Sequence, residues 1–149
     1  MNDHIFDFMP IVKQGYALTI IQYHSSPEFR FPTHIIDTKK AIHFIEKYYQ
    51  DYPIDINHIY LSGVSSGKHT ALMTLFTYHS DLFDDQKTPL LLLKGALNFY
   101  DIKHFSTMGE WWSKYSEEDQ NNINDLLGEH TLEDLEYASP INYIQENMT

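Results

Sequence analysis

The chain has 149 residues, a formal net charge of −11 and no cysteine, and 15% of its residues are aromatic. This length fits one compact domain, and the aromatic content argues against disorder. The acidic balance argues against a nucleic-acid or anionic-membrane surface, because both need clustered lysine and arginine. The absence of cysteine excludes disulfides, thiol catalysis and thiolate metal sites.

No segment resembles a membrane anchor or an export signal. The longest apolar run, residues 90–93, ends at Lys94 and is far too short to cross a bilayer. The first residues lack the basic and then apolar layout of a signal peptide. We therefore expect no membrane span and a cytoplasmic location.

The charge is unevenly placed along the chain. Residues 115–149 hold nine acidic side chains and no lysine or arginine. We interpret this stretch as a solvated acidic helical face, and a docking surface for a basic partner is the alternative. No linker rich in glycine, serine or proline divides the sequence, so we expect a single domain over residues 1–149.

The first two predicted elements are a strand and a helix. Residues 17–23 are β-branched, aromatic and nearly all apolar, which suits a strand buried on both faces. After a loop over residues 25–30, Pro32 opens an amphipathic helix, which should end near residues 52–53 because the residue before proline avoids the α region. The helix is recognised by an apolar stripe at helical spacing: Ile35, Ile42, Ile45 and Tyr49.

Three further elements complete the pattern. A short strand over residues 58–61 leads into a turn at residues 63–67, and an amphipathic helix follows. Residues 90–99 contain a third buried strand, with its centre at residues 94–99. The alternation of strand and helix predicts an α/β fold, in which a parallel sheet is flanked by helices through right-handed crossovers. Later residues predict loops and short helices, with Gly128 as a helix stop.

The turn at residues 63–67 carries the pattern Gly-x-Ser-x-Gly. A sharp strand-to-helix turn holds such a serine, here Ser65, in strained geometry with its hydroxyl exposed at the carboxyl edge of the sheet. Gly63 and Gly67 would remove side chains that clash in this turn. The N-terminus of the next helix could stabilise an oxyanion, and the N–H of Ser66 would be one donor.

Two other interpretations use the same residues. Ser65 could be a helix cap in a plain strand-to-helix turn. A phosphate-binding loop would need glycine at position 62 and serine or threonine at position 69, where the sequence has Ser62 and His69. These two mismatches argue against a phosphate site.

An ordered set of segments resembles the α/β-hydrolase superfamily, specifically its esterase/lipase family near the acetyl-esterase and carboxylesterase-like members. The resemblance covers most of the chain and corresponds to the central portion of that fold. It is carried by residues 15–23, Phe31-Pro32 with Asp37 and residues 41–42, Ile54-Asp55, residues 63–72, residues 95–100 and residues 137–141. One departure is Lys68, where these esterases usually carry a second glycine.

The resemblance implies hydrolysis of a small carboxylic ester through an acyl-enzyme. Ser65 would be the nucleophile, and Ser66 would supply an oxyanion-hole N–H. Asp37 and His69 match positions that the family commonly keeps, and we interpret both as structural. We expect no cofactor and no metal site, because the nine histidines show no metal-ligand spacing.

Several parts of that family's machinery have no counterpart in the chain. The triad acid and histidine should follow the next strand, and the His-Gly-Gly oxyanion loop should precede residue 1. We therefore expect a partial α/β-hydrolase fold that is truncated at both ends and inactive by itself. Four other residues could stand in for the triad acid and base, although none occupies a triad position: Asp101, His104, His130 and Asp134.

Two hypotheses for function follow. The chain could be a serine esterase that needs another polypeptide to supply the acid, the base and the missing strands. It could instead be a non-catalytic remnant or interaction protein from a split or truncated gene. A truncated sheet should expose apolar edges, so we expect association with a second copy or with a complementing chain. Residues 100–136, which are rich in aromatic side chains, could form a cap over an acyl pocket or pack as ordinary core.

Overall fold

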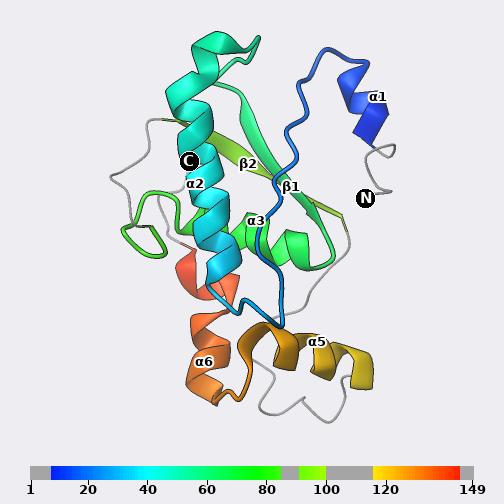
Figure 1. Ribbon diagram of the computed structural model, residues 1–149, viewed down its shortest axis with the longest axis vertical. Helices are drawn as coiled ribbons and strands as arrows, with labels where there is room; N and C mark the ends of the chain where they lie inside the picture. Colours follow the sequence, from blue (N-terminus) through cyan, green and yellow to red (C-terminus); the bar gives the residue numbers. More distant parts are fainter. Residues whose placement is uncertain (1–7, 85–90, 100–115, 145–149) are drawn as a thin grey trace.

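The computed structural model of the chain describes residues 8–84, 91–99 and 116–144 (Figure 1). A short helix, α1 (Met9–Val12), precedes an extended segment and the long helix α2 (Thr33–Tyr48), which continues into the 3-10 turn η2 (Tyr49–Asp51). Strand β1 (Ile59–Val64), helix α3 (Ser66–Phe76) and strand β2 (Leu93–Phe99) follow. Helices α5 (Glu117–Leu127) and α6 (Leu132–Tyr137) and the 3-10 turn η5 (Pro140–Tyr143) complete the described part.

The two strands form a parallel sheet, as the sequence predicts. Register pairs Ser62 with Leu97 and Gly63 with Asn98. Because the strands are parallel, the chain must cross over between them, and α3 supplies this crossover while it packs against both strands. The prediction of an α/β fold with a parallel sheet and flanking helices is confirmed in this partial form.

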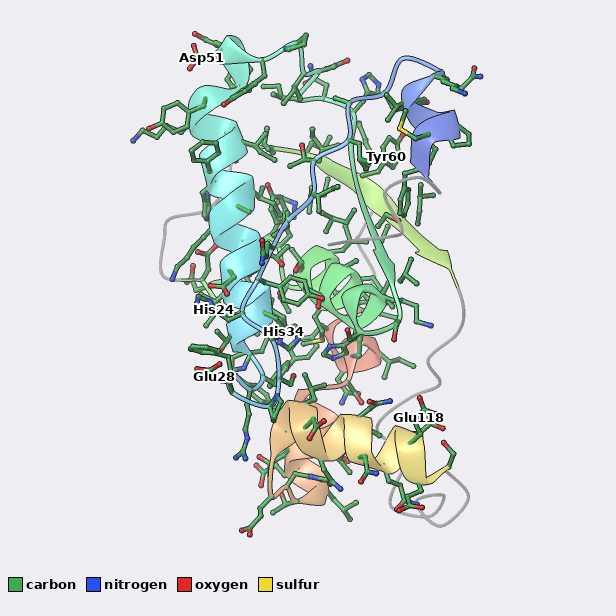
Figure 2. All side chains as sticks on the ribbon, turned by 45° about the vertical axis from the view of Figure 1, so that its right-hand side comes forward. His24, Glu28, His34, Asp51, Tyr60 and Glu118 are labelled. Atoms are coloured by element: carbon green, nitrogen blue, oxygen red, sulfur yellow. The ribbon has the colours of Figure 1, made fainter. Side chains whose placement is uncertain are left out.

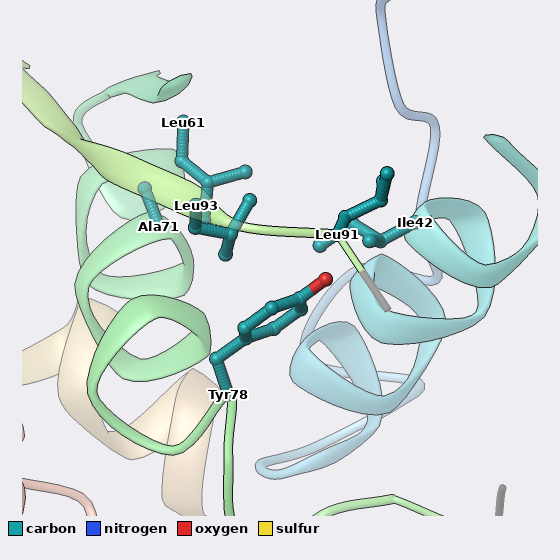
Figure 3. Packing of buried hydrophobic residues seen from close by; sticks show 6 residues of the cluster. All are labelled: Ile42, Leu61, Ala71, Tyr78, Leu91 and Leu93. Atoms are coloured by element: carbon teal, nitrogen blue, oxygen red, sulfur yellow. The ribbon is translucent and has the colours of Figure 1, made fainter. Parts of the chain in front are cut away.

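The main core lies where α2 and α3 meet one face of the sheet. Figure 3 shows Tyr78 filling the space between α2 and α3, with its hydroxyl directed toward Leu91 and Ile42. All the members of this core are buried: Ile42, Leu61, Ala71, Tyr78, Leu91 and Leu93. On the opposite face of the sheet, Tyr60 and Leu97 are each 48% exposed. Such exposure is unusual for a parallel sheet, whose faces are normally both covered.

The helix predicted from Pro32 onwards is confirmed by α2. Its apolar stripe points inward, and Ile35 and Ile42 are buried. The helix gives way to η2 and ends at Asp51, directly before the Tyr52-Pro53 pair that predicted its end. The order of β1, α3 and β2 confirms the predicted order of strand, helix and strand, but β1 continues to Val64, two residues into the predicted turn.

The prediction of a buried strand at residues 17–23 is wrong. Residues 16–25 are extended but belong to no sheet, and most of them are exposed, including Leu18 at 40% and Ile20 at 47%. Figure 1 shows this blue segment running past β1 towards the start of α2. An apolar run becomes a strand only where a neighbouring strand satisfies its backbone groups, and the described residues offer this segment no such partner.

Helices α5 and α6 form a separate small cluster below the sheet in Figure 1. Ile123 of α5 packs against Leu135 of α6 in this cluster. Gly128 ends α5 with a φ of 77°, which confirms the predicted helix stop. Thr131 and Asp134 form a capping box that starts α6.

Within the described ranges, no helix combines the length and the apolar character that a bilayer crossing demands.

Candidate active site

The candidate nucleophile, Ser65, lies between the end of β1 and the start of α3. Its backbone has φ 54° and ψ −124°, a conformation that residues other than glycine rarely adopt. Its side chain is exposed. Strain of this kind is worth about 1–3 kcal/mol and persists only where surrounding structure fixes it. Here the sheet fixes the residues before Ser65 and the helix fixes those after it.

The two glycines of the motif differ in how tightly they are packed. A Cβ atom on Gly63 would overlap the carbonyl group of Gly67, so the turn closes directly against the backbone at this position. A Cβ atom on Gly67 would meet only the Tyr23 hydroxyl, at 3.7 Å, which is an ordinary contact. The close approach therefore demands glycine at position 63 but not at position 67.

The first turn of α3 directs backbone donors towards Ser65. Ser66 is the first helical residue, and its N–H is one of those that a helix leaves without an intrahelical partner. The N–H of Lys68 already donates to the Ser65 carbonyl oxygen at 3.1 Å. The Lys68 side chain, which departs from the resembled family's usual glycine, is almost completely buried at 2% exposure.

His69 lies one helical turn beyond Ser65, and its ring is held by buried partners. Its Nε2–H donates to the Ala138 carbonyl oxygen at 2.7 Å, and its Nδ1 lies 3.5 Å from Nε2 of His34 on α2. Burial lowers the pKa of His69 to about 4, and burial together with the neighbouring His69 lowers the pKa of His34 to about 4. Both rings are therefore neutral at neutral pH, and His69 joins α3 to α2 and to the end of α6.

The His34 partner was not predicted from the sequence. It lies 35 residues before His69, and no local spacing connects the two positions. Its position directly after Pro32-Thr33, on the buried face of the predicted helix, is the signal that could have marked it as a core polar residue.

Asp37, the other residue interpreted as structural, binds the extended segment before α2. Its Oδ2 atom accepts hydrogen bonds from the His24 backbone N–H at 3.0 Å and from the His24 ring Nδ1–H at 2.7 Å. Figure 2 shows His24 on this segment beside the first turns of α2. A shallow hollow of about 430 Å³ is lined by Gln22, Tyr23, His24 and Asp37, and Ser65 is not among its lining residues.

The described residues bring no acid–base pair to Ser65. No hydrogen bond joins its hydroxyl to any residue in the described part of the chain, and His69 already engages Ala138 and His34. Asp134 is engaged in the capping box with Thr131, and the His130 ring donates to the Gly128 carbonyl oxygen at 2.8 Å. Asp101 and His104 lie outside the described residues.

No group of three or more histidine, aspartate or glutamate side chains within residues 8–84, 91–99 and 116–144 is arranged to hold a metal ion. Residues 100–115, the first part of the predicted cap region, also lie outside the described residues. The structure describes the rest of that region, which contains α5 and the start of α6.

The parallel sheet and its crossover helix form part of an α/β fold. The chain belongs to the BD-FAE family, an α/β-hydrolase-type esterase domain, and the family's profile matches residues 3–149. This match confirms the resemblance to the esterase/lipase hydrolases that the sequence motifs carry.

Three esterases of Mycobacterium tuberculosis are similar to the chain. Esterase LipQ is 26% identical over 111 residues, which cover 72% of this chain and 26% of LipQ. Esterase LipC is 28% identical over 102 residues, or 65% of this chain and 25% of LipC. The probable carboxylic ester hydrolase LipM is 25% identical over 99 residues, or 66% of this chain and 23% of LipM. The chain thus spans about a quarter of the length of these relatives. No solved structure matches it.

Proposed function

We propose that the chain carries the nucleophile of a serine carboxylic-ester hydrolase, with Ser65 attacking small ester substrates. The observation that carries this proposal is the backbone of Ser65, with its φ of 54° at the junction of a parallel strand and a helix. This geometry is what the nucleophile turn of an α/β hydrolase requires. The names of the similar esterases support the same substrate class.

In the proposed reaction, the Ser65 hydroxyl oxygen forms a bond to the ester carbonyl carbon while a base takes its proton. In this proposal the N–H of Ser66, the first residue of α3, stabilises the resulting oxyanion. The bond between the carbonyl carbon and the alcohol oxygen then breaks, and the alcohol leaves with a proton from the same base. Water hydrolyses the acyl-serine in the reverse sense and restores the hydroxyl.

The base and its acid partner would come from outside the described residues. His69 is a poor candidate for the base, because it is buried and already binds Ala138 and His34. We therefore favour a complementing polypeptide segment as the source of the acid, the base and the second oxyanion donor. The alternative is a non-catalytic member of the family, and it is favoured by the absence, in the described residues, of a hydrogen bond to the Ser65 hydroxyl.

Intact mass spectrometry after treatment with a fluorophosphonate probe tests the proposal, because the probe reacts rapidly only with an activated serine. When the probe is applied in the cells that produce the protein, where the complementing segment is present, we expect one adduct that is lost in Ser65→Ala and kept in Ser66→Ala. The second variant is a matched control, since it removes the neighbouring hydroxyl but keeps the Ser66 N–H. A demonstrably folded wild-type chain that stays unlabelled both in those cells and in isolation would instead support the non-catalytic alternative.

A further inference from the structure

A second polar cluster lies away from Ser65, where α2 meets the residues on either side of the α3–β2 connection. His43 on α2 is central to it. Its Nδ1 atom lies 2.9 Å from Oε2 of Glu46, and its Nε2 atom lies 3.2 and 3.3 Å from the two carboxylate oxygens of Asp84. The side chains are little exposed, at 10% for His43, 11% for Glu46 and 4% for Asp84.

The same glutamate also holds the residue that leads into β2. The second carboxylate oxygen of Glu46, Oε1, accepts a hydrogen bond from the Leu91 backbone N–H at 2.6 Å. His43 thus binds Asp84, which follows α3. Glu46 binds Leu91, which precedes β2. This cluster is near the Ile59–Leu93 end of the sheet, whereas the turn at Ser65 follows the opposite, Val64–Phe99 end.

The geometry favours the doubly protonated form of His43. Carboxylate oxygens only accept hydrogen bonds, so each ring nitrogen must carry a hydrogen to bond to its carboxylate. A histidine with two N–H groups is an imidazolium cation. A neutral ring would direct a lone pair at either Glu46 or Asp84, and one of the two contacts would no longer be a hydrogen bond.

We propose that His43 is a pH-operated clasp, which in its doubly protonated form ties α2 to both Asp84 and Leu91 and which loosens as the pH rises. No part of the esterase proposal is needed for this inference. The contacts of α2 with Asp84 and Leu91 would weaken when the His43 ring loses one proton.

The surrounding charges are consistent with this clasp. Burial lowers the pKa of His43, but the hydrogen bonds and charges of Glu46 and Asp84 outweigh burial and raise the pKa above its ordinary value. Lys39, also on α2, donates to the carbonyl oxygens of Thr77 and Leu82 at 2.7 and 2.6 Å.

Three other titratable groups belong to the surroundings of the clasp. The charges of Asp84 and Asp81 oppose the effect of burial, which lowers the pKa of Lys39. Burial and the two clasp carboxylates raise the pKa of Tyr78, so this phenol stays neutral. We therefore assign the pH dependence of the clasp to the His43 ring, whose pKa is raised.

Amide hydrogen exchange read by NMR, residue by residue, tests the clasp on the full chain. The readout is the protection factor of the Leu91 amide, which divides out the intrinsic pH dependence of exchange. We expect protection to fall as the pH rises above 6.5, about tenfold for each unit by which the His43 pKa is raised. In His43→Gln, which keeps one N–H donor but cannot carry the charge, protection should be low and independent of pH.

His58→Gln is the matched control. Nδ1 of His58 also lies 2.7 Å from a carboxylate oxygen, that of Asp55, but both side chains are exposed and they lie three residues apart in one turn. This variant should leave the Leu91 amide unchanged. Wild-type protection that stays constant across the range, or a His43→Gln variant that keeps the wild-type fall, would overturn the proposal.

A second measurement decides the question if His43→Gln fails to fold. Glu46→Gln keeps an oxygen for the Leu91 N–H but removes one of the two negative charges. Titration of the His43 ring by NMR should give a pKa above 6.5 in the wild type and a lower one in Glu46→Gln. A wild-type pKa at or below 6.5, or an unchanged pKa in the variant, would also overturn the proposal.

Discussion

Nε2 of His34 on α2 lies 3.5 Å from Nδ1 of His69 on α3, in a buried contact between two uncharged rings. His69 donates onward to the Ala138 carbonyl oxygen, so one chain of hydrogen bonds joins both helices to the residue that follows α6. Phe31 packs beside both rings, at 6.0 Å between ring centroids in each case. This cluster anchors the helix that begins at the candidate nucleophile.

The histidine pair should make the fold sensitive to acid. Both folded-state pKa values are about 4, below the ordinary value of 6.5, so the unfolded chain binds these protons more readily. The stability that the neutral pair contributes is complete above pH 6.5 and is lost as the pH falls towards 4. Each group can remove up to about 1.4 kcal/mol per pH unit in this window.

Urea unfolding at pH 7, 5.5 and 4.5 measures this loss. His69→Gln is the comparison, because glutamine can still donate to Ala138 but does not titrate. The free energy of unfolding should fall less steeply with acid in the variant than in the wild type. Parallel losses in the two proteins would show that the histidine pair is not the acid-sensitive element.

The strained backbone of Ser65 gives a prediction that needs no substrate. Ser65→Ala and Ser65→Gly both remove the hydroxyl, but only glycine adopts a φ of 54° without strain. We expect the glycine variant to be more stable than the alanine variant by about 1 kcal/mol, after the greater freedom of glycine in the unfolded chain is taken into account. Chemical denaturation at pH 7 measures the difference, and equal stability would show that the turn is relaxed in solution.

The tie between Asp37 and His24 should hold the extended segment at residues 16–25 in place. Asp37→Asn removes the charge that accepts both His24 hydrogen bonds, so we expect faster limited proteolysis within this segment. The loss of overall stability should stay below about 1 kcal/mol, because His24 is 58% exposed. Asp55→Asn is the control, since Asp55 accepts similar bonds within its own turn. Equal cleavage of both variants would contradict the tie.

The sequence predicts well the elements that local patterns determine. The apolar stripe of α2, the order of β1, α3 and β2, and the stop at Gly128 each depend on residues close together in the chain. The error at residues 17–23 has a different origin, because a strand also needs a neighbour and composition does not reveal one. The contacts of His34 with His69 and of His43 with Asp84 likewise join residues 35 and 41 positions apart. Only the folded arrangement of α2 against α3 and the residues that follow α3 reveals them.

The unequal packing of the two motif glycines leads to opposite expectations for two similar substitutions. In Gly63→Ala the new methyl group would overlap the Gly67 carbonyl, and the neighbouring backbone must shift. We expect a loss of stability of about 2 kcal/mol or more, in the range of overpacked core substitutions. In Gly67→Ala the methyl group has room, and Gly67 is the second residue of α3, where alanine is favoured over glycine by less than the ~1 kcal/mol of a helix interior.

Urea unfolding of both variants, with the same fluorophosphonate labelling as above, separates packing from chemistry. Gly67→Ala should fold at least as stably as the wild type, whereas Gly63→Ala should be the less stable of the two. If Gly67→Ala keeps its stability but loses the adduct at Ser65, glycine at position 67 is needed for the probe to reach Ser65 and not for the stability of the fold. A Gly63→Ala variant as stable as the wild type would contradict the close approach of Gly63 to Gly67, from which the tight turn at Ser65 is inferred.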